Sequence, residues 1–165
     1  MMRGWTRVLS VTALIAGVVV MGPANSAPVN QGQAAFSHGN YVRAAQLLAP
    51  LARRGNPKAQ AMLGFMYEHG LGAPQAYDMA VELYTGSAER GDPTGQYLLG
   101  LMYDKGHGVV RDDVLAYKWL DLAAAAAPVR ERERYLRIRD AVASKMSQDQ
   151  VVEGQRLAVN WRRRP

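Results

Sequence analysis

The sequence contains no cysteine, and its 165 residues include only three histidines and two phenylalanines. Without thiols the chain forms no disulfide framework, and it lacks the sulfur ligands of most structural zinc sites. The histidines do not fall at HxxxH or HxxE spacings; they are His38, His69 and His107. Since a zinc site needs three or four converging ligands, we expect no bound metal.

Motifs that carry catalysis are also missing from the sequence. It has no GxSxG nucleophile motif, no Walker motif and no dinucleotide-binding glycine pattern. Its one acidic pair, Asp112-Asp113, is explained by helix capping, and no two carboxylates are spaced for acid–base catalysis. We therefore expect no catalytic residue, no cofactor and no enzymatic activity.

The first 26 residues have the pattern of a secretory signal peptide. Two arginines precede an apolar stretch, residues 8–21, which ends at Gly22-Pro23 and is followed by small residues at 24–27. An uncleaved membrane anchor is the alternative, but the apolar stretch is shorter than the roughly 20 residues of a spanning helix. We expect cleavage before Ala27, export to a bacterial periplasm or secretion, and no stable membrane insertion afterwards.

The charge of the chain is mildly positive. Twenty basic and 14 acidic residues give a net charge of +6, and loss of Arg3 and Arg7 with the signal peptide leaves 18 − 14 = +4. A balance of this size supports solubility more than binding to nucleic acid, so we expect no nucleic-acid partner.

What the sequence does have is an internal repeat of 36 residues. Gly55-Asn56-Pro57 recurs as Gly91-Asp92-Pro93, and the later motif LGxMYxxGxG also recurs at the same offset. Residues 55–90 and 91–126 share 11 identities, nearly all of them glycine, proline, alanine or large apolar residues. Such residues determine turns and packing, so the repeat indicates a stacked repeat architecture and not a catalytic site.

Each repeat has the signals of two antiparallel helices. Asn56 or Asp92 provides a capping oxygen, and the proline that follows occupies the first helical position. We expect the first helices to end at Gly70 and Gly106, because glycine accepts the left-handed conformation that ends a helix. The second helices are predicted over about 75–90 and 112–126. Gly64 and Gly100 lie inside helices at a cost of about 1 kcal/mol each, which indicates a close approach of helices.

This pattern resembles the Sel1-like repeat (SLR) family, a relative of the tetratricopeptide repeats. The resemblance is carried by Ala59-Gln60, Leu63-Gly64, Met66-Tyr67, Gly70, Gly72, Ala80, Tyr84, Ala88 and Gly91, and by their counterparts in the next repeat. It implies an all-α, right-handed α-α superhelix whose first helices line a concave surface. The sequence departs from the family pattern at Gly95, where alanine is usual, and at Ala61, where an aromatic residue is usual.

The units at the two ends of the repeat array are less regular. Residues 29–54 are predicted to form a partial repeat with a short first helix, about 31–37, that lacks the Leu-Gly core. Residues 127–165 lack the repeat signature and are predicted to form two C-terminal capping helices, about 129–145 and 148–162. Ser147 and Gln150 have the spacing of a capping box. The predicted organisation is therefore a signal peptide over 1–26, helical repeats over 27–126 and the cap over 127–165.

The cap begins with a segment rich in arginine. Arginines at 130, 132, 134, 137 and 139 interleave with acidic residues at 131, 133 and 140. One interpretation is an anion-binding surface. The other is a solvated helix face with local ion pairs such as Glu133 with Arg137.

The candidate partner-binding residues are the variable positions of the first helices. These positions step by three and four residues and so share a helix face; they are Met62, Phe65, His69, Leu98, Leu101 and Lys105. The sequence does not decide whether they form a groove or belong to the core.

Together with the signal-peptide pattern, the resemblance implies an exported, non-catalytic adaptor that binds a protein or peptide on the concave face. Two alternatives are an enzyme of the cell envelope, or its peptidoglycan-related accessory, and peripheral attachment to an anionic surface through the arginine-rich segment.

The signal-peptide interpretation predicts the mass of the mature protein. Mass spectrometry of material from the envelope of the source cell should give an N-terminus between Asn25 and Pro28, because the small residues of the cleavage motif end there. An intact Met1 in the envelope fraction contradicts cleavage and supports the membrane anchor.

Overall fold

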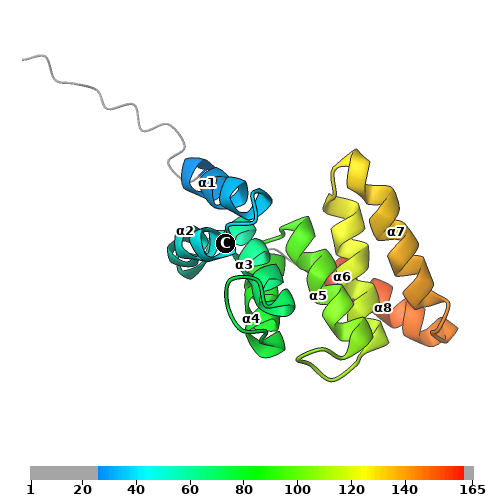
Figure 1. Cartoon of the computed structure of the whole chain (residues 1–165). Coiled ribbons are helices and arrows are strands. Elements are labelled where there is room, and N and C mark those ends of the chain that lie inside the picture. The colour runs from blue at the N-terminus through cyan, green and yellow to red at the C-terminus, as the bar shows by residue number, and fades with distance from the viewer. Residues whose placement is uncertain (1–25, 162–165) are drawn as a thin grey trace, which may run out of the picture.

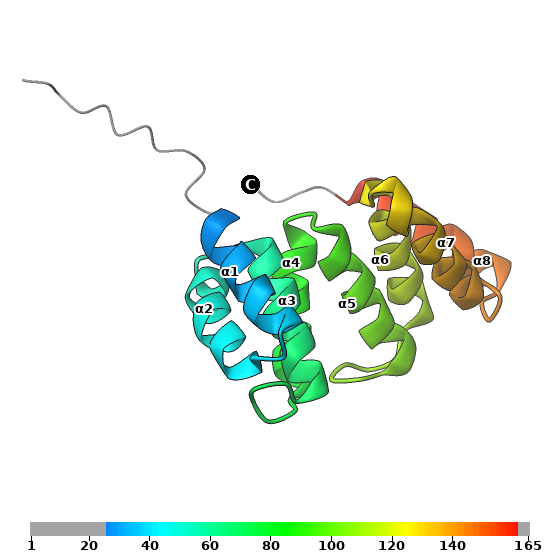
Figure 2. The same cartoon turned by 45° about the horizontal axis from the view of Figure 1, so that its top comes forward.

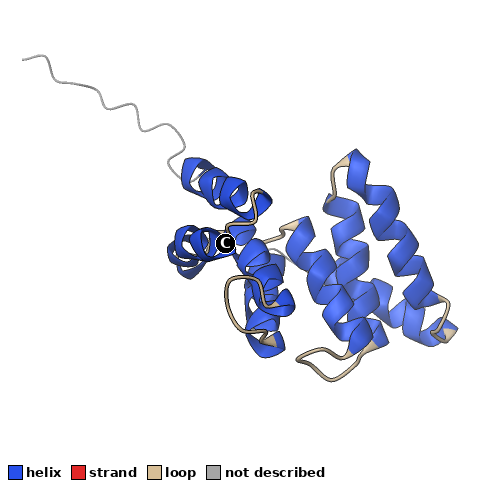
Figure 3. Ribbon diagram, viewed as in Figure 1, coloured by secondary structure: helices blue, strands red, loops and turns tan. Residues whose placement is uncertain are grey.

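The computed structural model describes residues 26–161. Residues 1–25, which belong to the predicted signal peptide, and residues 162–165 lie outside the described part of the chain. The described part of the chain consists of helices and connecting turns, without a strand (Figure 3). The helices are α1 (Ser26–Ser37), α2 (Tyr41–Arg53), α3 (Pro57–His69), α4 (Tyr77–Glu89), α5 (Pro93–Lys105), α6 (Asp113–Ala126), α7 (Val129–Ala143) and α8 (Gln148–Asn160). The predicted all-α class is confirmed. Within these residues no helix combines the length and the apolar character needed to cross a bilayer.

The helices form a superhelical array of antiparallel pairs. Helices α1 and α2, α3 and α4, and α5 and α6 pack as pairs, and the first helix of each following unit packs on the second helix of the unit before it. Figures 1 and 2 show the resulting progression along the array, from α1 to α7. Each unit therefore buries an apolar face that it cannot bury alone, as in other repeat proteins.

The ends of the repeat helices follow the sequence signals. The side chains of Asn56 and Asp92 accept hydrogen bonds from the backbone N–H groups three residues later, at 3.0 and 2.9 Å. Gly70 and Gly106 adopt the left-handed conformation, with φ of 65° and 71°, and end α3 and α5 as predicted. Helix α4 begins at Tyr77, two residues later than predicted. Gln75 lies in the loop before it, where its amide donates to the Glu68 carbonyl at 2.7 Å.

The pairs are held at close range by glycines at one position of the first helix. A Cβ atom on Gly64 would lie 2.7 Å from Cε1 of Tyr84, and one on Gly100 would lie 2.8 Å from Cγ of Leu120. Separations this short leave no room for a side chain. The two helices of each repeat therefore pack with glycine backbone directly against a large, fully buried side chain.

The first unit uses the same contact in a different register, which corrects the prediction that it lacks this core. A Cβ atom on Gly32 would lie 2.6 Å from Cδ2 of Leu48. These two residues are 16 positions apart, whereas Gly64 and Tyr84 are 20 apart, because the turn between α1 and α2 is four residues shorter. Helix α1 also begins at Ser26 and not near Gln31. Pro28 sits in its first turn, where proline is tolerated because no hydrogen bond is lost there.

Neighbouring units are joined by a repeated hydrogen bond. The side-chain amide of Gln60 donates to the carbonyl of Ala52 at 3.2 Å, and that of Gln96 donates to the carbonyl of Ala88 at 3.3 Å. In each case the bond runs from the first helix of one repeat to the second helix of the unit before it. The glutamine retained at this position therefore has a structural role between repeats.

The C-terminal helices continue the array only in part. Helix α7 begins at Val129, 36 residues after α5, and packs on α6. Helix α8 begins after the predicted capping box at Ser147, and it also packs on α6 instead of pairing with α7. A Cβ atom on Gly154 of α8 would lie 2.8 Å from Cδ1 of Tyr117. Helix α8 therefore covers the last repeat as a cap. The two cap helices end two residues earlier than predicted, at Ala143 and Asn160.

The one buried side-chain carboxylate of the described core has a buried partner. The Tyr84 hydroxyl donates to Oε2 of Glu68 at 2.7 Å, and both side chains are almost fully buried. Burial, reinforced by the Glu68 carboxylate, raises the pKa of the Tyr84 hydroxyl far above its ordinary value. The hydroxyl therefore stays protonated and continues to donate, which makes the pair a structural link between α3 and α4.

The close contact at Gly100 predicts a stability defect. Gly100→Leu should lower the free energy of unfolding by about 1–3 kcal/mol or more, because the added side chain overlaps Leu120. Ala125→Leu is the matched control, because it adds a leucine at an exposed position of α6. Urea denaturation followed by circular dichroism measures both. Wild-type stability of Gly100→Leu contradicts the close-approach argument.

The Tyr84–Glu68 pair predicts a second stability effect. Tyr84→Phe should lower the free energy of unfolding by about 1–3 kcal/mol, because it leaves a buried carboxylate without its donor. Glu68→Leu combined with Tyr84→Phe should cost less than the sum of the single changes, since neither polar group then remains unpaired. Additive losses in the same denaturation assay show that the hydrogen bond contributes nothing.

Candidate functional site

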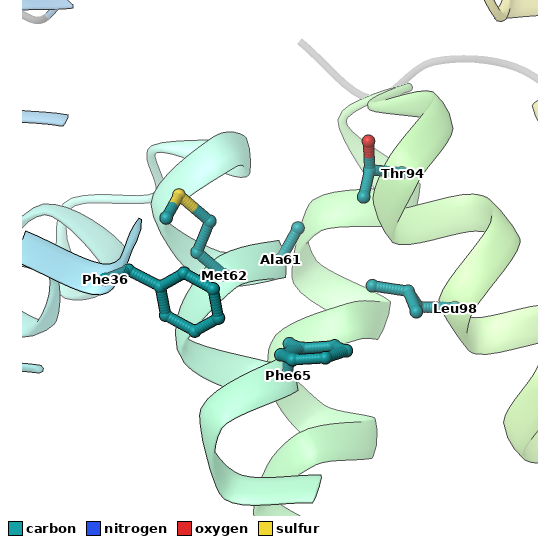
Figure 4. A pocket seen from close by; sticks show the side chains of 6 residues that line it. All are labelled: Phe36, Ala61, Met62, Phe65, Thr94 and Leu98. Carbon is teal, nitrogen blue, oxygen red and sulfur yellow. The ribbon is translucent and has the colours of Figure 1, made fainter. Parts of the chain in front are cut away.

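An apolar hollow opens between the first helices of three consecutive units. It has a volume of about 230 Å³ and is lined by Phe36 of α1, by Ala61, Met62 and Phe65 of α3, and by Thr94 and Leu98 of α5 (Figure 4). Thr94 provides the only hydroxyl of this lining. The hollow therefore offers apolar surface in contact with solvent, bounded by rings, a thioether and aliphatic groups.

Aromatic contacts hold one wall of the hollow in place. The Phe65 ring lies edge-on to the Phe36 ring, with 6.0 Å between centroids, and stacks on the His69 ring at 4.1 Å. Phe36 in turn lies edge-on to Tyr41 at 5.4 Å. The His69 ring nitrogen Nδ1 lies 3.0 Å from the Phe65 carbonyl oxygen, which fixes the imidazole at the end of α3. These contacts link α1, the start of α2 and α3 along one wall.

The hollow exists because of one small residue. Ala61 lies at the position that Tyr97 occupies 36 residues later, and Tyr97 fills its space by stacking on Tyr135 of α7 at 4.3 Å. Ala61 has no ring to extend toward α5, and its side chain lines the hollow instead. The departure from the usual aromatic residue thus has a structural consequence, namely an open space between α3 and α5.

The structure brings three of the six predicted binding residues together. Met62, Phe65 and Leu98 line the hollow, and His69 joins them through its stack on Phe65. Leu101 is half-buried, Lys105 is exposed in the last turn of α5, and neither lines the hollow. Three of the predicted residues therefore lie around one hollow, whereas Leu101 and Lys105 lie outside it, and the binding role of all six stays a prediction.

The predicted residues that line the hollow also contribute to the core. Met62 packs against the core of the first two units, and Phe65 and Leu98 pack against the core around Tyr84 and Leu99. All three are half-buried and also face the hollow. They support the core from one side and present apolar surface from the other.

Sequence reasoning missed Phe36 as a member of this site. The period of 36 residues does not align α1 with α3, because the first unit has a shorter turn, so Phe36 has no equivalent in the predicted face. A shift of 32 residues aligns Gly32 with Gly64 but also aligns Phe36 with Glu68, so only the structure shows that Phe36 lines the hollow.

The described residues include no group of three or more metal-ligating side chains placed to hold an ion. The histidines lie at three different turns. Nδ1 of His38 lies 2.7 Å from the Ala34 carbonyl oxygen, and the His107 ring packs on the Tyr77 ring at 4.6 Å. The rings are therefore engaged in local contacts of the turns.

The arginine-rich helix α7 is paired differently from the prediction. The ion pair of Glu133 with Arg137 does not form in the described structure. Instead Arg139 Nη1 contacts Oδ1 of Asp121 in α6 at 2.8 Å, and Glu131 lies near two other arginines of α7. The Arg139 guanidinium also contacts Asp140 of α7 at 2.7 Å, and its contact with Asp121 docks α7 on α6.

The comparisons with known proteins agree with this architecture. Residues 57–92 and 93–127 match the model of the Sel1 repeat. The solved structure of a protective antigen present in uropathogenic Escherichia coli strains displays an SLR fold. It is 25% identical in sequence to this chain, with a TM-score of 0.76, and the match covers 83% of this chain and 29% of the antigen. A Sel1 repeat protein from Oxalobacter formigenes is 24% identical in sequence to this chain, with a TM-score of 0.64. That match covers 81% of this chain and 56% of the other. No curated protein matches significantly.

The matches fix the kind of protein but not its partner. The chain spans less than two thirds of the length of either solved structure. Sel1 repeat proteins are generally scaffolds for protein interactions, and the family is typically non-catalytic. The two matched repeats, their capped helix pairs and the likeness to solved SLR folds together identify the chain as a helical repeat protein of the Sel1-like repeat family.

Proposed function

We propose that the protein is an exported, non-catalytic scaffold that binds a protein or peptide on the face formed by the first helices. The observation that carries the proposal is the apolar hollow between α1, α3 and α5. In this proposal the hollow receives an apolar side chain of the partner. Export rests on the signal-peptide pattern of the first 26 residues.

The chemistry of the hollow suits an anchoring side chain. Binding energy at protein interfaces concentrates in a few apolar or aromatic anchors that fill pockets and lose their contact with water. Aromatic residues and methionine are enriched at such interfaces, and here Phe36, Phe65 and Met62 form the wall. The half-buried rings are already ordered by packing, so little additional side-chain entropy is lost when a partner binds.

Polar groups at the ends of the first helices supply orientation. His69 and Lys105 occupy equivalent positions at the ends of α3 and α5, and both are exposed. An extended peptide or an amphipathic helix placed across α3 and α5 can bury its apolar side chains in the hollow and meet these polar ends beyond it. The proposal therefore predicts a partner segment with both apolar and polar contacts.

The proposal is tested by crosslinking in the envelope of the source cell, followed by affinity capture. The double variant Phe65→Ser with Leu98→Ser should reduce capture of a specific partner by more than about tenfold, because it removes two walls of the anchor site. Val42→Ser with Val159→Ser, at exposed positions of α2 and α8, is the matched control and should capture normally.

The folded state is checked on the same variants by circular dichroism and melting temperature. Thr94→Trp provides a second variant, since it is designed to fill the hollow from its exposed edge while Phe65 and Leu98 keep their core contacts; it removes the side-chain hydrogen bond of Thr94 with Tyr135. Unchanged capture by both hollow variants with an intact fold moves the interface to another surface. Unfolding of the serine variant together with normal capture by Thr94→Trp assigns Phe65 and Leu98 to the core alone.

A further inference from the structure

Helix α7 presents the same face as the first helices of the repeats, although it lacks their sequence signature. It begins at Val129, and α3 and α5 begin at Pro57 and Pro93, so the three starts are 36 residues apart. The three helices also turn the same face toward the core. Leu63, Leu99 and Tyr135 occupy one position of this register, and all three are buried. The face of α7 that corresponds to the hollow can therefore be identified residue by residue.

The character of this face changes from apolar to cationic along the array. The equivalent positions are Lys58, Thr94 and Arg130; Met62, Leu98 and Arg134; and Phe65, Leu101 and Arg137. We call Arg130, Arg134 and Arg137 the arginine stripe. Arg134 and Arg137 occupy on α7 the positions at which α3 and α5 carry the predicted apolar anchors, and Arg130 occupies the position of Lys58 and Thr94.

The arginine stripe is open to solvent and its charge is only partly balanced. The Arg130 and Arg134 side chains are 91% and 56% exposed. Arg130 lies 3.6 Å from the Glu131 carboxylate and Arg134 lies 3.8 Å from it, so both ion pairs are long. Arg137 is exposed and forms no ion pair within the described chain. The Glu131 carboxylate is shared between these two arginines and Tyr135, because it also accepts a hydrogen bond from the Tyr135 hydroxyl at 3.1 Å.

The charges around the face sum to a positive value. The stripe with Lys58 and Lys105 supplies five positive charges, and Glu131 and Glu133 supply two negative ones, which leaves 5 − 2 = +3. Helix α1, on the other side of the hollow, carries no charged residue. Apart from Lys58 at the start of α3, the positive charges of this face lie on α5 and α7, so the face is apolar at α1 and around the hollow and cationic at α7.

A chain of contacts connects the stripe to the hollow. The Arg134 guanidinium lies 5.2 Å from the centroids of both Tyr97 and Tyr135, and these two rings stack on each other. Tyr97 is the neighbour of Leu98, which lines the hollow. Adjacent packed helices lie about 8–10 Å apart, and an extended peptide advances about 3.3 Å per residue. A peptide that leaves the hollow toward α7 reaches the stripe after roughly three to six residues.

We propose that the partner segment is an acidic peptide with one apolar anchor. The anchor occupies the hollow, and aspartate or glutamate residues three to six positions away pair with the arginine stripe. Arginine suits this role because its planar guanidinium binds a carboxylate through two parallel hydrogen bonds. This inference rests on the proposed function and specifies the chemistry of the partner that the same face selects.

The experiment is selection of a phage-displayed library of random 12-residue peptides on the purified full chain. The test variant replaces the stripe: Arg130→Gln, Arg134→Gln and Arg137→Gln together. The matched control makes the same change in charge at three exposed residues of α2 and its C-cap, namely Arg43, Arg53 and Arg54. A third protein carries Thr94→Trp to close the hollow.

Selection on the wild type should enrich peptides in which Asp or Glu lies three to six residues from a large apolar residue. The strongest such peptide, made synthetically with a fluorescent label, should bind the stripe variant at least about fivefold more weakly in anisotropy titrations, since three ion pairs are lost. The α2 control should bind within about twofold of the wild type. Raising NaCl from 0.05 to 0.3 M should weaken wild-type binding more than binding by the stripe variant.

The outcomes separate the inference from the function on which it rests. Enrichment of apolar peptides without acidic residues, blocked by Thr94→Trp, leaves the docking face intact and overturns the acidic partner. The absence of any enriched peptide contradicts the proposed function itself. Wild-type binding to phosphatidylglycerol vesicles that is lost in the stripe variant, with no acidic peptide selected, assigns the stripe to an anionic membrane and also overturns the inference.

Discussion

The structure depends on the direct contact between a glycine of each first helix and a large buried side chain of the second. Gly32, Gly64 and Gly100 meet Leu48, Tyr84 and Leu120 at separations that exclude a Cβ atom. This contact fixes the distance within each helix pair, and the packing of the next unit follows from it. A glycine in a helix costs about 1 kcal/mol, and the three-fold use of this position shows that the packing gained outweighs that cost.

With the spacing of the pairs fixed, the remaining side chains of the first helices are free to differ. The repeat tolerates Ala61 where the next unit has Tyr97, because the inter-helix contact is made at another position. The same freedom permits arginine on α7 where α3 and α5 carry apolar residues. Because the packing contact is constant and the exposed positions vary, one backbone arrangement presents different surfaces along the array.

The cap shows how an array of this kind ends. Helix α7 keeps the register of a first helix and docks through Arg139 on Asp121, while α8 turns back onto α6 through Gly154 and Tyr117. The apolar side of α6 is thereby covered without a further repeat. Because α8 does not cover the outer side of α7, the arginine stripe remains in solvent beside the repeats.

The helix pairs, their caps and their order can be predicted from the amino-acid sequence alone. Turn glycines and capping residues are local signals that act within a few residues of the chain, and the 36-residue period shows how the helix pairs follow one another. The sequence also named Met62, Phe65 and Leu98, since helical spacing decides which residues share a face. Only the tertiary structure brought Phe36 beside them, showed that Ala61 leaves a hollow, and paired Arg139 with Asp121. These depend on the distances between helices, which arise from packing across units and cannot be obtained from spacing along one helix.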